Sequence, residues 1–461
     1  MADHKGKGVI CYCPRFWYTV HSWGLRPALM SSRIKLSIVA MSTLLVGALL
    51  AGAMMSRNGS SEDTYRHLRV YSEVLSKIKS DYVEEPDMKN VTLGAINGLL
   101  ESIDPYASYL SAEQYQQYLK QKETDKAGVG LVLSRRYGYI GVAGAIPGSP
   151  AAKAGIGTGD VIETINGVST RDMPLAFADL MLHGRQGTNV EIAVLRFRRP
   201  EPQKIGLTRA IITYPKVNSK MLEDKIGYVQ AQTLEENRLS EVAAALKDLE
   251  KQGAQKMILD VRNCTTGPAQ AGIALANLFV DKGLIASLRG QRTEPQEFRA
   301  DPAKQIWKAP LAVITNRGTA SGCEVASGAL LDSSRAHLVG ERTYGDAALR
   351  KAVSLDDGSA VILSVAKYSS PLGKVIQETG ITPPVAVADS TLHPEAGEEE
   401  EPSPPEQQPP PKPAGDEPLK KAIEILKKGE PPAPQTASGN VKEKNSQDPT
   451  MGPLNIPRPP R

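Results

Sequence analysis

The stretch TNRGTASGCEVASGALLD, residues 315–332, decides the fold of this 461-residue chain. The apolar run Leu311–Thr315 leads into it and predicts a buried strand, and the small residues at 325–331 predict a tightly packed helix. Ser321 therefore lies at a strand-to-helix turn, where backbone N–H groups and the positive helix end stabilise an oxyanion. Glu324, three residues later, shares a helix face with it. Taken alone, the pattern fits a serine that caps the helix as well as a nucleophile.

Strand and helix signals alternate on the N-terminal side of this stretch. Residues 226–231 and 256–261 are apolar enough for buried strands, and Val242 and Leu246 lie on one face of a helix between them. Buried strands that alternate with amphipathic helices are typical of an α/β layer structure. We therefore predict a mixed α/β fold whose core spans residues 213–390.

A second block, residues 125–212, alternates short β-rich runs with turn signals. It opens with Gly128, Val129, Gly130 and Leu131, where the glycines leave consecutive backbone N–H groups open to approach. Such a backbone is suited to an anionic peptide C-terminus. The simpler alternative is an ordinary strand start that carries two glycines.

The N-terminal part of the chain predicts an anchor followed by helices. Residues 36–55 are twenty residues without a charge, long enough for one membrane-spanning helix. Six Lys and Arg against one Asp in residues 1–35 predict a cytoplasmic N-terminus and an exported remainder. A cleaved signal segment is the alternative. Residues 62–124 carry apolar side chains at helical spacing and predict a helical region.

The C-terminal part, residues 391–461, has a different composition. It holds 17 of the 34 prolines, which favours a disordered tail because such a segment buries little apolar surface. One short helix is predicted at residues 418–429, where Leu419, Ile423 and Leu426 share a face. Gly429 is its expected end.

Composition excludes several classes of protein. The net charge of +4 and the aromatic content of 5% argue against a nucleic-acid-binding protein. Four cysteines without a C-x-x-C pair and six histidines without an H-x-x-x-H motif argue against a metal site. We expect neither a metal nor another cofactor.

Stretches in a fixed order across residues 65–388 resemble the C-terminal processing (tail-specific) serine peptidase family. Besides the stretch at 315–332 and the 125–212 block, they are LESIDPYASYL (100–110), IGYVQAQTL (226–234), ILDVRN (258–263), LVGERTYG (338–345), LDDGSAVILSVAKY (355–368) and GITPPV (380–385). The resemblance implies an α/β peptidase core with an inserted PDZ domain at 125–212. It also implies a serine nucleophile, a lysine general base and cleavage of exported proteins near their C-termini.

The resemblance assigns roles to single residues. It implies Ser321 as nucleophile, Glu324 as the accompanying acid, and the backbone of Gly322 and Gly267 as oxyanion donors. Gly128, Val129, Gly130 and Leu131 would bind the peptide C-terminus, with residues 175–183 forming the other wall of the groove.

The same resemblance fails at the general base. Asp346 stands where the family has its lysine, and Arg350 where some members have an assisting glutamine. Lys351 is an unsuitable replacement because its odd offset from 346 turns it to the opposite face of a strand, and arginine does not deprotonate. We expect a binding protein with impaired or absent catalysis; a working endopeptidase with an unconventional base is the alternative.

The resemblance also implies the environment of the protein. Partners would be the C-termini of exported polypeptides and, through residues 36–55, the inner membrane of a bacterial cell envelope. Cys264 and Cys323 both fall in the presumed site on the exported, oxidising side. They are either small buried residues that fill space or a disulfide, and the separation of their Cα atoms decides between the two.

Overall fold

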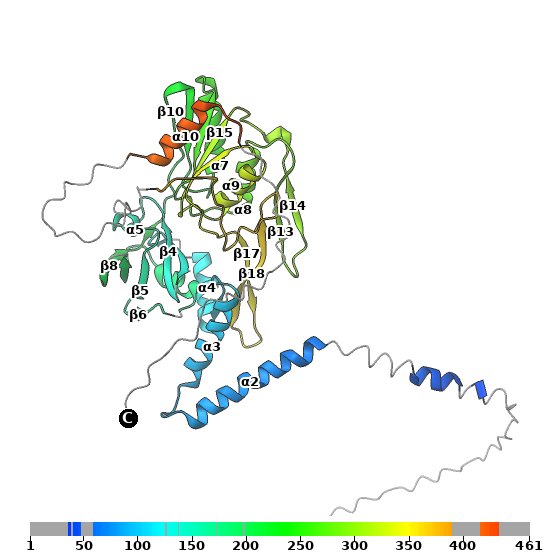
Figure 1. Cartoon of the computed structure of the whole chain (residues 1–461). Helices are drawn as coiled ribbons and strands as arrows, with labels where there is room; N and C mark the ends of the chain where they lie inside the picture. The colour runs from blue at the N-terminus through cyan, green and yellow to red at the C-terminus, as the bar shows by residue number, and fades with distance from the viewer. Residues whose placement is uncertain are drawn as a thin grey trace, which may run out of the picture. The chain divides into compact units, whose positions relative to one another are not determined.

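The computed structural model describes residues 36–37, 40–47, 59–124, 127–136, 138–171, 173–196, 199–389 and 415–432 (Figure 1). The predicted segment 1–35, most of the predicted anchor at 36–55, and most of the predicted tail at 391–461 lie outside these residues. Within them, no helix combines the length and the apolar character that a bilayer crossing requires. The chain divides into two compact units, Met1–Met88 and Lys89–Arg461.

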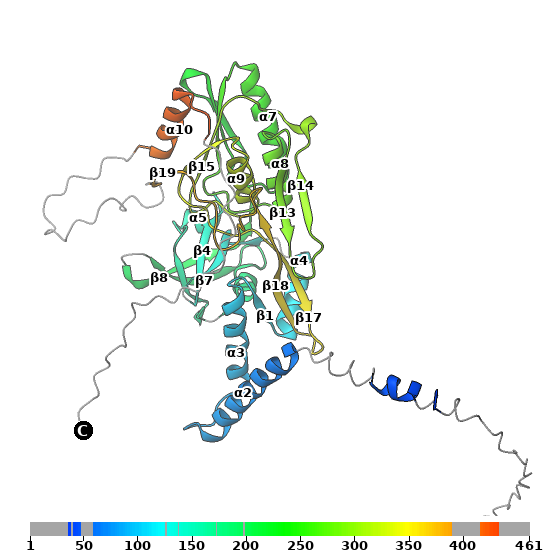
Figure 2. The ribbon, with the colours of Figure 1, turned by 45° about the vertical axis from the view of Figure 1, so that its right-hand side comes forward.

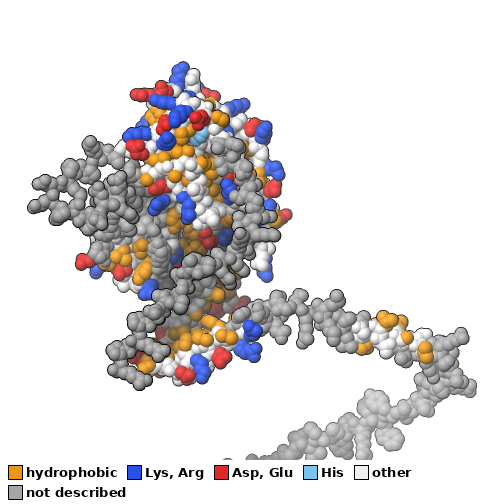
Figure 3. Space-filling view, viewed as in Figure 1, with side chains coloured by type: hydrophobic (Ala, Val, Ile, Leu, Met, Phe, Trp, Pro, Cys, Tyr) orange, Lys and Arg blue, Asp and Glu red, His pale blue; other side chains and the backbone are white. Residues whose placement is uncertain are grey.

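The first unit contains helix α2 (Gly59–Asp81), and it carries apolar side chains on its surface. Leu68, Val70 and Val74 are each more than half exposed, and hydrophobic side chains gather along this helix in Figure 3. Among the α2 residues whose burial is described, none is buried.

The N-terminal helical region also contains one short strand. Helices α3 (Met88–Ile103) and α4 (Ala112–Thr124) flank strand β1 (Ser108–Leu110), which pairs antiparallel with residues 360–362 of the core. The sequence does not indicate this strand because three residues are too few to show a period, and the strand pairs with a distant partner.

The core of the second unit is a six-stranded sheet in the order β10, β11, β12, β15, β16, β19. All neighbouring pairs are parallel except β10 with β11. Its strands are β10 (Asn218–Met221), β11 (Ile226–Gln230), β12 (Lys256–Asp260), β15 (Leu311–Thr315), β16 (His337–Gly340) and β19 (Val385–Ala386). A short 3₁₀ turn, Glu223–Lys225, precedes β11.

Helices cover both faces of this sheet (Figures 1 and 2). Met257 and Leu259 pack on the side of α7 (Arg238–Lys251), α8 (Ala269–Asn277) and α9 (Gly322–Asp332). Ile258 points to the other side, where α10 (Glu417–Lys428) packs. A sheet buried on both faces explains why its strands are continuous apolar runs in the sequence.

Helix α10 begins and ends close to the predicted positions. Asp416 caps its start by accepting a hydrogen bond from the backbone N–H of Leu419, and Gly429 ends it at a φ of 71°. Arg262 donates to both Asp416 and Asp260, which joins the start of α10 to the end of β12.

A second sheet in the core unit has the order β1, β18, β13, β14, with β17 paired to β18. Its remaining strands are β13 (Leu284–Arg289), β14 (Gln296–Arg299), β17 (Ala348–Ser354) and β18 (Ala360–Ser369), and a 3₁₀ turn, Pro302–Lys304, follows β14. The β17–β18 hairpin is the gold pair of strands in Figure 2. Asp346 lies just before this hairpin, and Arg350 lies within β17, so the region predicted for the general base is at the start of the hairpin.

The block at 125–212 forms its own sheet and its own core. Its order is β3, β4, β5, β7, β8, with β6 beside β5, and the small pair β2–β9 lies apart. Buried Ile140, Ile162, Leu182 and Ile192 pack inside it. The elements are β2 (Ala127–Gly128), β3 (Leu131–Arg136), β4 (Tyr139–Ala145), α5 (Pro150–Lys153), β5 (Val161–Ile165), β6 (Val168–Ser169), α6 (Leu175–Leu182), β7 (Asn189–Arg196), β8 (Arg199–Thr208) and β9 (Ala210–Ile211).

Candidate active site and peptide-binding loop

Ser321 lies at the first turn of α9 in a costly backbone conformation. Its φ is 54° and its ψ is −128°, a region that residues other than glycine rarely occupy and that is found mostly at functional sites. Its hydroxyl does not cap the helix; the Oγ–H donates to the carbonyl oxygen of Gly267 at 2.8 Å. The cap interpretation of this serine is therefore wrong, and its hydroxyl is directed at the loop before α8.

The predicted oxyanion donors are joined to each other. The backbone N–H of Gly322 donates to the same Gly267 carbonyl at 3.2 Å, so this carbonyl takes two hydrogen bonds. Gly267 has a φ of 132°, and a Cβ there would lie 2.5 Å from that of Leu234, so only glycine fits. In this conformation the Gly322 N–H already donates to a carbonyl, although an oxyanion would need the same N–H.

A disulfide ties the loop before α8 to α9. Cys264 and Cys323 are bonded, with their Cα atoms 6.2 Å apart and both residues fully buried. The pairing alternative therefore holds, and two free space-filling thiols are excluded. The bond fixes the Gly267 loop against the helix that carries Ser321.

Glu324 is fully buried and holds the loop before β17 against α9. Its carboxyl group accepts hydrogen bonds from the hydroxyl of Thr343 and from the backbone N–H groups of Gly345 (2.6 Å) and Asp346 (2.7 Å). Burial raises the pKa of Glu324 to about 8, although the three hydrogen bonds oppose the shift. Glu324 therefore fixes where the residue at position 346 lies relative to the serine helix.

Asp346 forms an ion pair with Arg350, the residue four positions later in the chain. The Arg350 guanidinium lies 4.1 Å from the ring centre of Tyr106, a cation–π contact. Burial alone would lower the pKa of Arg350, but Asp346 raises it overall. Burial also raises the pKa of the Tyr106 phenol. The two family-assigned positions are thus engaged with each other and with Tyr106.

Lys351 lies on β17, outside the hydrogen-bonded groups of the candidate site. It pairs with Leu363 across the β17–β18 hairpin and is exposed, whereas Arg350 pairs with Ser364. In the described part of the chain, the hydrogen-bond partners of Ser321, Glu324 and Asp346 include no lysine. Across the same residues, no group of three or more His, Cys, Asp or Glu side chains is placed to hold a metal ion.

Two backbone N–H groups of the predicted peptide-binding loop donate to no described residue. Val129 and Gly130 are buried between β2 and β3, and among the described residues neither N–H group donates a hydrogen bond. Their carbonyl groups do accept, from Ala151 and Ile146. Buried N–H groups are almost always paired, so this pair needs an acceptor from water or a ligand. The Val129 and Leu131 side chains instead pack into the core of the block.

Comparison with known proteins identifies both the α/β core and the block at 125–212. The profile of peptidase family S41 matches residues 225–387, and a PDZ domain profile matches residues 141–196. The carboxy-terminal processing protease CtpA of Bacillus subtilis is 32% identical over 77% of this chain and 78% of its own length.

The chain belongs to the carboxy-terminal processing peptidases of family S41.

Other relatives agree with this assignment. A carboxy-terminal-processing protease of Bartonella bacilliformis is 30% identical over 74% of this chain and 80% of its own length. Among solved structures, a photosystem II D1 C-terminal processing protease matches with a TM-score of 0.57 and 28% identity, over 69% of this chain and 92% of its own. The predicted family and the predicted fold, a mixed α/β peptidase core with a PDZ domain, are confirmed.

The S41 core and the PDZ domain meet at the active-site loops. A Cβ on Gly144 of β4 would lie 2.3 Å from Cγ2 of Thr265, and one on Gly318 would lie 3.3 Å from Oγ1 of Thr158. Thr265 belongs to the loop before α8, and Gly318 to the turn before Ser321. The PDZ domain therefore packs directly against two loops of the candidate active site.

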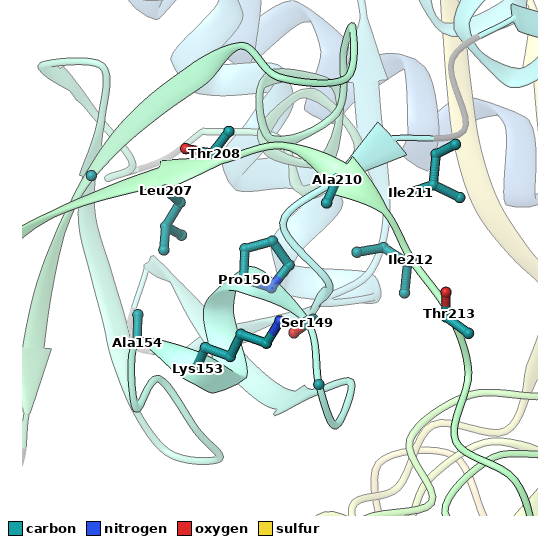
Figure 4. Close-up of a pocket in the computed structure, with 12 residues that line it drawn as sticks. Ser149, Pro150, Lys153, Ala154, Leu207, Thr208, Ala210, Ile211, Ile212 and Thr213 are labelled. Carbon is teal, nitrogen blue, oxygen red and sulfur yellow. The ribbon is translucent and has the colours of Figure 1, made fainter.

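A cavity of about 650 Å³ lies in the PDZ domain and not at Ser321. Figure 4 shows it between α5 and the segment from β8 to Thr213, with Lys153 as its single charged lining residue. Ser149 and Ile212 line it and also contact Gly130, because a Cβ there would lie 2.3 Å and 3.2 Å from them. The cavity therefore backs the peptide-binding loop.

Three residues of the candidate site escape sequence analysis. Tyr106 lies in a stretch that carries the family resemblance, yet nothing local marks it as a partner of Arg350. Thr343 contacts Glu324, and Thr265 contacts the PDZ domain. All three act through contacts with residues distant in the chain, which a local pattern does not contain. His183 belongs to the predicted groove wall at residues 175–183, and the structure places it beside Gly128.

Proposed function

We propose that this S41 family member binds the C-termini of exported polypeptides through its PDZ domain and hydrolyses them slowly or not at all. The hydroxyl hydrogen bond of Ser321 carries the proposal, because a peptide carbonyl cannot take up the proton as a general base would. The ion pair of Asp346 with Arg350 supports it, since the position that the family resemblance gives to lysine holds a carboxylate in contact with a cation. Loss of the base in a serine hydrolase costs on the order of 10⁴–10⁶ in rate.

The binding half of the proposal is supported by the loop at residues 128–131. The N–H groups of Val129 and Gly130, which donate to no described residue, are the kind of donors that hold a carboxylate. Recognition of a free C-terminus is also what the family relationship suggests for the PDZ domain.

Export and membrane anchoring are part of the same proposal. The buried disulfide between Cys264 and Cys323 supports an oxidising, extracytoplasmic compartment. The uncharged residues 36–55 and the basic residues before them support a single inner-membrane anchor or a cleaved signal segment.

The cleavage half is tested with a disordered peptide that ends in apolar residues. We expect the purified protein to cleave it no faster than its Ser321→Ala variant. Asp346→Lys combined with Arg350→Gln is expected to add Ser321-dependent cleavage, because the pair restores the residues that the family resemblance assigns. Rapid cleavage by the unmodified protein that disappears in Ser321→Ala would contradict impaired catalysis.

One observation favours the alternative of an active peptidase with an unconventional base. The φ of 54° at Ser321 is costly, and such strain persists where it serves a reaction. The same cleavage assay separates the two functions, since only an active enzyme shows a difference between the unmodified protein and Ser321→Ala.

The binding half is tested with the acid and amide forms of one apolar peptide. Amidation should weaken binding by at least ~1.5 kcal/mol, because it removes charge-assisted hydrogen bonds to the loop. Calorimetric titration measures both affinities, and equal values would show that the loop does not recognise a carboxylate.

A further inference from the structure

His183 lies at the entrance of the peptide-binding loop. It follows the last residue of α6, and the next residue, Gly184, donates its N–H to the carbonyl of Ala127 at 3.1 Å. This places the end of α6 directly beside the start of the loop. A Cβ on Gly128 would lie 2.9 Å from Cδ2 and 3.0 Å from Nε2 of His183, so the imidazole rests on that glycine.

The two ring nitrogens of His183 have different surroundings. Nδ1 lies 2.9 Å from the backbone carbonyl of Asp179 and 3.5 Å from its carboxylate, so Nδ1 carries the hydrogen. The opposite edge, with Nε2, faces Gly128. No hydrogen bond of Nε2 with another described residue is present, and about a third of the side chain is exposed. When the imidazole is protonated, Nε2 therefore offers a charged donor at the loop.

Arg209 is another cation at this end of α6, and most of its donors are already used. Its Nε donates to Leu182 and its Nη2 to Met181, which satisfies two carbonyls at the helix end. Its Nη1 donates to Thr188 and Asn189. Four of its five N–H groups are thus engaged within the PDZ domain, so Arg209 holds the end of α6 in place and does not compete with His183 as a donor to a ligand.

We propose that His183 determines the specificity of the peptide-binding loop by donating a hydrogen bond from its protonated Nε2–H to the free α-carboxylate of a bound C-terminal peptide. The inference rests on the proposed recognition of polypeptide C-termini. The N–H groups of Val129 and Gly130 supply neutral donors, and His183 adds the positive charge. Charge-assisted hydrogen bonds are about twice as strong as neutral ones.

The proposal makes peptide binding dependent on pH. Histidine side chains change charge between about pH 5 and pH 8, whereas a peptide carboxylate stays ionised over this range. Among the described residues, the charged groups near His183 include Asp179 on its own helix, Arg185 two residues along the chain, and Arg209 on the segment that follows β8. Tyr118 of α4 lies near Asp179. We expect affinity for the acid form of a peptide to rise about tenfold from about pH 8 to about pH 5.5.

The experiment is a calorimetric titration of the purified full chain with an N-acetylated apolar peptide that lacks titratable side chains. Its acid and amide forms are compared at about pH 5.5 and about pH 8. We expect the pH effect for the acid form alone. His183→Gln should abolish it, and Gly128→Ala should reduce it, because the added Cβ displaces the ring. His337→Gln is the matched control and should keep it, since that ring contacts the carbonyl of Glu430 in the core unit.

The outcomes separate this inference from the proposed function. Preference for the acid form with the same pH dependence in His183→Gln would overturn the role of His183 and leave C-terminus recognition intact. Preference for the acid form without any pH dependence in the unmodified protein would do the same. Equal binding of acid and amide at both pH values would overturn recognition of the C-terminus itself.

Discussion

At the scale of single residues, Glu324 shows how burial changes the chemistry of a side chain. It lies three residues after Ser321 in the chain, yet its carboxyl group contacts Thr343, Gly345 and Asp346 and has no solvent exposure. Its pKa of about 8 means that, near neutral pH, the folded protein keeps a proton on this carboxyl group that the unfolded chain has lost. Glu324 is therefore a positioning residue for the loop before β17.

This shift predicts a pH dependence of stability. The unfolded glutamate titrates near 4.5 and the folded one near 8, so the folded state holds the extra proton between these values. The free energy of unfolding should therefore fall as pH rises through this window, on the order of 5 kcal/mol over its full width. Urea unfolding at several pH values measures it.

Two variants check the origin of the effect. Glu324→Gln cannot titrate and should show a flatter pH profile. Glu250→Gln, on the exposed face of α7, is the matched control and should keep the profile of the unmodified protein. The same slope in Glu324→Gln would assign the pH dependence to other groups.

At the scale of elements, the disulfide joins α9 to the loop that precedes α8. Cys264 and Cys323 are 59 residues apart in the chain, and Gly267 follows Cys264 by three residues. The bond therefore holds the Gly267 carbonyl where it accepts from both Ser321 and Gly322. It also restricts the unfolded chain, which stabilises the folded state.

Removal of the disulfide should destabilise the protein. Cys264→Ala with Cys323→Ala is expected to lower the free energy of unfolding by about 4 kcal/mol in the chain-entropy account. Denaturant unfolding with and without a thiol reductant measures it; the reductant should affect the unmodified protein and leave the double variant unchanged. The other two cysteines of the chain, Cys11 and Cys13, supply the control: Cys11→Ser with Cys13→Ser should keep the free energy of unfolding of the unmodified protein. A reductant-insensitive unmodified protein would contradict a stabilising bond.

At the scale of the whole core unit, the PDZ domain and the peptidase core depend on each other through Gly144. This glycine is in β4 and leaves room for Cγ2 of Thr265, which lies in the loop between Cys264 and Gly267. If residue 144 were alanine, its methyl group and Cγ2 of Thr265 would have to occupy the same volume. The lack of a side chain at one position is therefore a requirement of domain packing.

The packing predicts a non-additive pair of substitutions. Gly144→Ala should destabilise the protein by about 1–3 kcal/mol through overpacking. Thr265→Ser removes Cγ2, so Gly144→Ala should cost much less in that background. Gly157→Ala in the same domain is the control, because a Cβ there meets nothing within 4 Å. Equal costs of Gly144→Ala in both backgrounds, measured by urea unfolding, would exclude this contact.

The sequence by itself determined the local elements and the family. The strand at Leu311–Thr315 and the end of α10 at Gly429 lie where apolar runs and a helix-ending glycine predict them. These features depend on neighbours in the chain, so periodicity and turn residues are sufficient to find them. The ordered motifs across residues 65–388 gave the S41 relationship and the positions of Ser321 and Asp346, because order and spacing survive where single residues differ.

The tertiary structure decided what these residues do. Ser321 and Gly267 are 54 positions apart, so no local pattern shows that the serine hydroxyl meets a carbonyl there. The choice between paired and free Cys264 and Cys323 depended on a Cα separation, which the chain sets only when α9 packs beside α8. Strand β1 and the contact of His183 with Gly128 likewise form only between distant segments. Side-chain type and local period specify an element, but hydrogen bonds and close contacts depend on distances that only the packed chain fixes.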